Sequence, residues 1–142
     1  MAMITSPGIK QAVPLFMVVN MQRSLDFYTK GLGFELKNTW EPAGKIDWCW
    51  LQLDNASIML QEYRETPSIE NRGEGITINF VCEDALAVYD RMIANGLSPS
   101  EPFVGNNMWV VPLKDPDGYK LFFESATDVP EETKYFDWTK NK

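Results

Sequence analysis

The chain has 142 residues, of which 44% are hydrophobic and 23% are charged, so its size and composition predict one globular domain with its own core. The formal net charge of −7 argues against a nucleic-acid partner, because phosphate binding needs a surplus of lysine and arginine on the surface. No apolar run approaches the roughly 20 residues that cross a bilayer, and no apolar segment follows basic residues at the N-terminus, so we expect neither a membrane partner nor a signal peptide.

The first half of the chain predicts a strand, a helix and three more strands. An apolar run at residues 13–19 predicts the first strand, and Asn20 supplies an N-cap for a helix over residues 21–32. That helix has one apolar face, formed by residues three and four positions apart: Met21, Leu25, Tyr28 and Leu32. Turn-forming residues then separate three predicted strands, at residues 34–40, 46–53 and 57–63.

The second half repeats this order of elements. A strand is predicted at residues 76–82 and a helix at residues 84–94, which ends at Asn95-Gly96. The side chains expected to face inward from that helix are Ala85, Val88, Tyr89 and Met92. Three strands are predicted near residues 102–104, 108–113 and 119–125, and an Asp-Pro-Asp-Gly turn at residues 115–118 joins the last two.

Similar side chains recur in the two halves at an offset of 63 residues, which indicates a duplicated α+β fold. The aligned pairs are Val18 with Val81, Gly33 with Gly96, Phe34 with Leu97, Ile58 with Leu121, Leu60 with Phe123, and Gln61 with Glu124. We expect one domain over residues 1–142, made of two tandem β-α-β-β-β modules at about residues 12–64 and 76–126. A polar linker at residues 65–75 joins the modules, and a tail at residues 127–142 follows them.

The tail is predicted to form a short helix. Asp128 is a suitable cap, Pro130 suits the first helical turn, and two glutamates follow at the positive end of the helix. The aromatic residues beyond them are expected to dock on the body of the domain or on a partner subunit: Tyr135, Phe136 and Trp138.

Two stretches of sequence carry a resemblance to a known family. The segments VVNMQRSLDFYTKGLGFEL (18–36) and KDPDGYKLFFES (114–125) resemble the first-helix and last-turn signatures of the glyoxalase / bleomycin-resistance / extradiol-dioxygenase superfamily, the vicinal oxygen chelate proteins. With the repeat, the resemblance covers about residues 12–126. It implies a curved, cup-like mixed sheet around a ligand, with the helices outside and a homodimer as the assembled form. The fold alone does not specify the reaction.

The same resemblance implies four metal-ligand positions, on the first and last strands of the two modules. They fall at Val13 or Pro14, Met59, Thr77 and Phe122. None of these side chains is a credible ligand for the usual divalent ions, and the chain contains no histidine. We therefore expect a protein without a metal or another cofactor.

The two cysteines, Cys49 and Cys82, each lie within an apolar, strand-like run. Buried free thiols are the simpler interpretation, and they indicate a reducing compartment. We therefore expect a cytoplasmic protein.

Strand alternation predicts which side chains line the cup. Ser57, Met59, Gln61 and Tyr63 share one face of the last strand of the first module, and Lys120, Phe122 and Glu124 share the corresponding face in the second. Trp48 and Trp50 share a face of their strand, with Trp40 close by, and Trp109 is placed at the equivalent position of the second module. The predicted ligand-binding residues are Trp48, Trp50, Met59, Gln61, Tyr63, Trp109, Phe122 and Glu124.

Three functions are compatible with these residues. The first is a metal-independent binding protein of the bleomycin-resistance type, in which indole rings and Glu124 hold an aromatic or cationic small molecule between two subunits. The second is a metal-independent enzyme, an isomerase or lyase acting on a small carbonyl compound, with Glu124 as the candidate catalytic base and Tyr63 or Tyr119 as donor. The third is a cup filled by its own side chains, which acts through its surface. No nucleophile–base pair is visible, which favours binding over catalysis.

Overall fold

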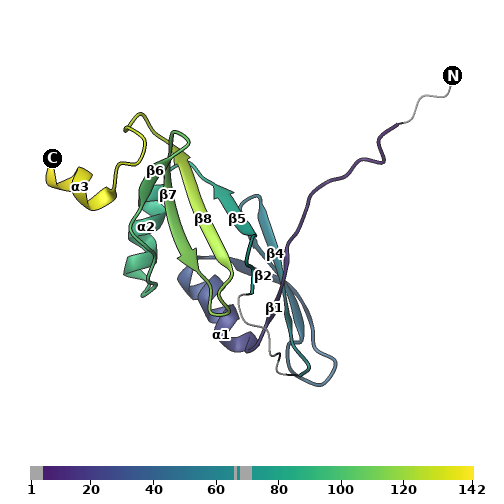
Figure 1. The fold of residues 1–142 in the computed structure, drawn as a ribbon. Helices are drawn as coiled ribbons and strands as arrows, with labels where there is room; N and C mark the ends of the chain where they lie inside the picture. The colour runs from purple at the N-terminus through teal and green to yellow at the C-terminus, as the bar shows by residue number, and fades with distance from the viewer. Residues whose placement is uncertain (1–4, 66, 68–71) are drawn as a thin grey trace.

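The computed structural model describes residues 5–65, 67 and 72–142, and it contains two mixed four-stranded sheets with a helix associated with each (Figure 1). The strand orders are β1-β4-β3-β2 and β5-β8-β7-β6, so each sheet belongs to one β-α-β-β-β module. This confirms the predicted α+β fold with two tandem modules. Part of the predicted linker at residues 65–75 lies outside the described residues.

The elements follow the predicted order in both modules. The first module contains β1 (Leu15–Val18), α1 (Met21–Asp26), a π-helical turn η1 (Phe27–Gly31), β2 (Glu35–Trp40), β3 (Trp48–Leu53) and β4 (Ala56–Glu62). The second contains β5 (Thr77–Val81), α2 (Ala85–Ala94), β6 (Phe103–Gly105), β7 (Met108–Lys114) and β8 (Lys120–Ala126). A last helix, α3 (Tyr135–Lys140), lies in the tail. Among the described residues, no helix is long and apolar enough to span a membrane.

Side-chain caps begin the first two helices. The Asn20 side chain accepts a hydrogen bond of 3.0 Å from the backbone N–H of Arg23, which confirms the predicted cap of α1. Asp84 accepts one of 3.0 Å from Ala87 in the same way at the start of α2. In each module the helix packs on one face of the sheet, α1 on β4 and α2 on β7 and β8.

Burial alternates along the last strand of each module, as the sequence predicts. Ile58 and Leu60 of β4 are fully buried on the helix side of the sheet, whereas Met59 and Gln61 are half-buried on the other side. Leu121 and Phe123 of β8 are buried on the helix side in the same way. We call the side away from the helices the cup face of each sheet.

The offset of 63 residues holds between β4 and β8 but not between the first strands. Gln61 pairs with Met17 in the parallel β1–β4 ladder, and Glu124 pairs with Val81 in the β5–β8 ladder. Met17 is therefore the counterpart of Val81, and the predicted match of Val18 with Val81 is wrong by one residue. The burial agrees, because Val18 is 0% exposed on the helix side and Val81 is 77% exposed on the cup face.

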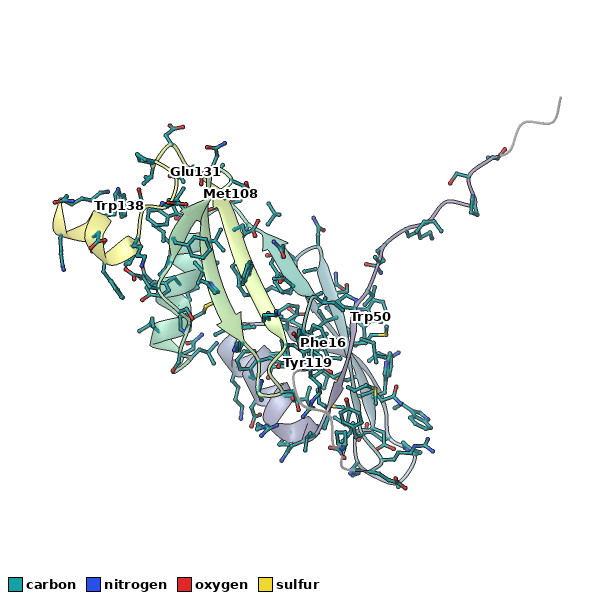
Figure 2. All side chains as sticks on the ribbon, in the orientation of Figure 1. Phe16, Trp50, Met108, Tyr119, Glu131 and Trp138 are labelled. Carbon is teal, nitrogen blue, oxygen red and sulfur yellow. The ribbon has the colours of Figure 1, made fainter. Side chains whose placement is uncertain are left out.

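The two modules meet where the turn before β8 packs against β1 and α1. The ring of Tyr119 stacks on Phe16, with centroids 4.5 Å apart, and the two side chains lie together in Figure 2. The Tyr28 hydroxyl donates a hydrogen bond of 2.8 Å to the Asp115 carboxylate, and both residues are buried. One apolar cluster therefore contains side chains from both modules.

The tail forms its helix later than the sequence predicts. The predicted cap at Asp128 is wrong, because α3 begins at Tyr135 and its N-cap is Lys134. The preceding segment pairs with the edge strand β6 instead. The Glu132 N–H donates a hydrogen bond to the Val104 carbonyl, and the Val104 N–H donates one to the Thr133 carbonyl, each 2.9 Å long. The tail thus covers a sheet edge before its helix begins.

Candidate functional site

The cup face of the first sheet carries two rows of side chains that run across its strands. In one row Trp50 lies directly opposite Met59, which pairs in turn with Leu15 of β1. In the other row Trp48 lies opposite Gln61. The structure therefore brings together four of the predicted ligand-binding residues, because directly paired residues share a face and have Cβ atoms about 5 Å apart.

A third indole extends the second row. Trp40 of β2 pairs directly with Trp48, so the two side chains lie on the same cup face. The sequence places Trp40 close to the other two without assigning it to the site. In the structure an irregularity between Leu36 and Asn38 breaks the alternation along β2, so the pairing with Trp48 is what places Trp40 on the cup face. Trp40, Trp48 and Trp50, which we call the indole face, therefore share the cup face of two adjacent strands, with Met59 opposite Trp50.

The cup face of the second sheet carries Lys120, Phe122 and Glu124, in the predicted phase. Glu124 is only 7% exposed, and its Oε1 atom accepts a hydrogen bond from the side-chain amide of Asn79 on the neighbouring strand β5. Its other carboxylate oxygen accepts no hydrogen bond from the described residues. Asn79 is not among the residues that the sequence predicts for the site, because its contact with Glu124 depends on the β5–β8 register.

Trp109 does not lie with the other indoles. It pairs with Ser125 on the helix side of the second sheet, whereas its neighbour Val110 pairs with Glu124 on the cup face. The predicted equivalence with Trp48 and Trp50 is therefore wrong, and Trp109 instead packs against the Trp138 ring of α3 at 5.2 Å. Figure 2 shows Trp138 and Trp50 on opposite sides of the molecule.

The two tyrosines considered as donors lie near the junction of the modules. The Tyr119 hydroxyl donates a hydrogen bond of 2.9 Å to the Met17 carbonyl, and burial is the main cause that raises the pKa of Tyr119 to about 12. Tyr63 follows the end of β4, where the guanidinium carbon of Arg72 lies 5.5 Å from its ring centroid. The Tyr119 hydroxyl is thus already used in a hydrogen bond that joins the two modules, whereas Tyr63 lies at one end of the cup face.

The family's metal positions do not hold a ligand set here. Strand register places the first position at Val13. Val13 lies two residues before Leu15, the strand partner of Met59, just as Thr77 lies two residues before Asn79, the strand partner of Phe122. Valine and phenylalanine carry no donor atom, and a thioether with one hydroxyl does not suit a hard divalent ion. Among the described residues, no three histidines, cysteines or carboxylates lie close enough together to hold a metal ion.

The thiols are not activated as nucleophiles. Burial raises the pKa of Cys49 to about 11, and burial also raises the pKa of Cys82 above its ordinary value. At neutral pH both side chains are therefore thiols rather than thiolates. Neither forms a disulfide.

Two hollows border the cup faces of one chain, through Lys120 on β8 and Gln52 on β3. A hollow of about 410 Å³ is lined by Arg72, Glu74, Lys114, Asp117, Gly118 and Lys120. A second hollow of about 180 Å³ is lined by residues of β2 and β3 and their neighbours: Gly33, Glu35, Lys37, Gln52, Leu53 and Asp54. Neither hollow is lined by any of the eight predicted ligand-binding residues.

Comparison with known proteins points to one family. The family model for the glyoxalase/bleomycin resistance protein/dioxygenase superfamily matches residues 8–123, and no curated protein gives a match. A candidate glyoxalase family protein from Bacillus anthracis is 14% identical, with a TM-score of 0.69 over 87% of this chain and 100% of that chain. TioX from Micromonospora sp. ML1 is 17% identical, with a TM-score of 0.66 over 82% and 98%. An integron cassette protein from the mobile metagenome of the Halifax Harbour sewage outfall is 23% identical, with a TM-score of 0.63 over 82% and 99%.

Proposed function

The chain belongs to the glyoxalase/bleomycin resistance protein/dioxygenase superfamily, and from this premise we propose that it is a metal-independent protein that binds a flat aromatic or cationic small molecule. The observation that carries the proposal is the indole face: three tryptophans on adjacent strands, with Met59 beside them, on the cup face where relatives hold ligands. Indole rings stack on flat ligands and attract cations through the negative face of the ring.

Glu124 supplies the negative charge of the proposed site. Asn79 engages one oxygen of the Glu124 carboxylate, and the other oxygen is not a buried atom without a partner, so it is open to contact from the cup. The free oxygen is suited to an ammonium or amidinium group of the ligand. This arrangement supports the bleomycin-resistance-like branch of the family over the metalloenzyme branches.

We propose that a second copy of the chain closes the cup. Large apolar side chains remain open to solvent on both cup faces: Leu15 is 42% exposed, Trp40 is 46% exposed and Val81 is 77% exposed. Side chains of this kind are costly to leave on a surface and are typical of interfaces. A homodimer would bury them and convert an open face into an enclosed site. The free thiols of Cys49 and Cys82 support a cytoplasmic location.

A titration of intrinsic tryptophan fluorescence with bleomycin tests the proposal. Saturable quenching by the drug is expected, together with a loss of affinity of about tenfold in Trp50→Ala, since stacking and cation–π contacts contribute roughly 1–2 kcal/mol. Trp138→Phe is the matched control, because it removes an indole outside the cup and should leave the affinity unchanged. A flat response to the drug, with tight binding of zinc or manganese in a parallel titration, would overturn the proposal.

The charge and the dimer are tested separately. Glu124→Gln keeps the shape of the side chain and its contact with Asn79 but removes the charge. It should therefore lower the affinity for a cationic drug and leave the affinity for a neutral aromatic ligand unchanged. Sedimentation velocity should give a dimer for the wild type and a monomer for Val81→Glu, which places a charge on the exposed cup face. A wild-type monomer at all concentrations would refute the closed cup.

A further inference from the structure

The hollow of about 410 Å³ beside the last turn is lined by cationic side chains, although the chain as a whole is acidic. Lys114 of β7 and Lys120 of β8 are direct partners in the antiparallel ladder, so their side chains leave the same face of the sheet. Like charges that lie directly opposite each other destabilise a strand pair. This sheet therefore carries a repulsion that a bound anion would relieve.

The acidic residues of the neighbouring turn are engaged by groups other than the two lysines. The fully buried carboxylate of Asp117 meets two arginines, Arg72 at 2.8 Å and Arg23 at 3.6 Å. Asp115 accepts hydrogen bonds from Tyr28 and from two backbone N–H groups of its own turn. Neither aspartate is free to neutralise the lysines.

The lysines themselves form no ion pair with any described carboxylate. Glu74 is the remaining acid of the lining, and it is exposed at the surface. Arg72 contributes a third cationic group whose side chain is 18% exposed and held in place by Asp117. The lining thus carries a net positive charge, because the three cationic side chains of Arg72, Lys114 and Lys120 stand against the two carboxylates of Glu74 and Asp117.

We propose that this hollow binds a phosphate monoester, with Lys114 and Lys120 holding the dianionic group. Two ammonium groups match the two charges of a phosphate ester, and lysine is a common phosphate ligand as a point charge. The volume exceeds that of a phosphate ion and lies within the range of pockets that bind small organic molecules. The site lies on β8 four residues from Glu124, about 14 Å along the strand, and it does not depend on the indole face.

Thermal unfolding of the full chain with and without glycerol 1-phosphate tests the proposal, because the ligand should reverse the sign of the difference in stability between the wild type and Lys114→Gln. Without the ligand, Lys114→Gln should be slightly more stable than the wild type, because it removes the repulsion. With the ligand at tens of millimolar, the wild type should become the more stable protein, because only its intact site is occupied. Lys120→Gln should behave in the same way, and Lys140→Gln is the control with an equal change of charge on α3.

A calorimetric titration gives the affinities. Inorganic phosphate and glycerol 1-phosphate should both bind, and each lysine substitution in the hollow should weaken them about tenfold, the loss expected for one charge-assisted contact. Sodium chloride at matched ionic strength should give no binding signal. Equal weakening by Lys140→Gln would overturn the site, and tighter binding of malonate than of phosphate would overturn the assignment to phosphate esters.

Discussion

The hydrogen bond between Tyr28 and Asp115 joins the two modules, and its loss should destabilise the whole domain. The bond is 2.8 Å long, Tyr28 is 0% exposed and Asp115 is buried. Burial, followed by the neighbouring Asp115 charge, raises the pKa of Tyr28 well above its ordinary value, so the phenol remains protonated and acts as the donor. Tyr28→Phe keeps the ring and removes only this donor.

The expected loss is about 1.5–3 kcal/mol at neutral pH, the value for a hydrogen bond to a charged group. For a chain of this size that corresponds to a fall in Tm of roughly 5–10 °C. Urea unfolding followed by circular dichroism measures the free energy directly. Tyr89→Phe is the control, because its hydroxyl makes no hydrogen bond among the described residues and its loss should change stability by less than about 0.5 kcal/mol.

A double-mutant cycle isolates the bond from other effects of the substitution. Tyr28→Phe should cost much less in an Asp115→Asn background, where the charge that strengthens the hydrogen bond is absent. Equal losses in Tyr28→Phe and Tyr89→Phe, or an unchanged cost in the Asp115→Asn background, would show that the bond does not hold the modules together.

Three further predictions follow from burial. Burial raises the pKa of Asp115 above its ordinary 3.8, so the ionised carboxylate lowers the free energy of unfolding at neutral pH. As the pH falls through the raised pKa towards 3.8, the wild type should therefore gain stability relative to Asp115→Asn. Unfolding measured as a function of pH tests this. Trp138→Ala should expose Trp109 and lower the free energy of unfolding by about 1–2 kcal/mol, less than for a core tryptophan because Trp138 is only half-buried; the fluorescence maximum should shift to the red, and no red shift would mean that α3 does not cover Trp109. In the native protein Cys82 should react with a thiol reagent well before Cys49, whose pKa is raised to about 11, and equal rates would contradict that difference in burial.

The strands whose faces the sequence predicted correctly have a clear alternation. In β4 and β8 aliphatic or aromatic residues alternate with more polar ones, so Ile58, Leu60 and Leu121 identify the buried side. In β7 the run Met108–Leu113 is apolar throughout, and such a run carries no information on phase. The predicted face of Trp109 is therefore wrong, and the pairing with Ser125 places this residue on the helix side.

Long-range backbone pairing explains the other errors. The sequence signals for a helix start at Asp128 and Pro130 are genuine local preferences, but hydrogen bonds of residues 132–133 to Val104 on β6 compete with them and delay the helix. The contact between Asn79 and Glu124 likewise depends on the register of two strands more than 40 residues apart. A single sequence does not encode such a register in a readable form.

Fluorine NMR of the protein labelled with 5-fluorotryptophan tests the proposed site most directly. The five tryptophans should give five resonances, each assigned by a single Trp→Phe substitution. On addition of bleomycin the resonances of Trp40, Trp48 and Trp50 should shift together and saturably, while those of Trp109 and Trp138 should stay in place. Shifts confined to Trp109 and Trp138, or no shift in the indole face, would contradict an aromatic ligand site on the cup face.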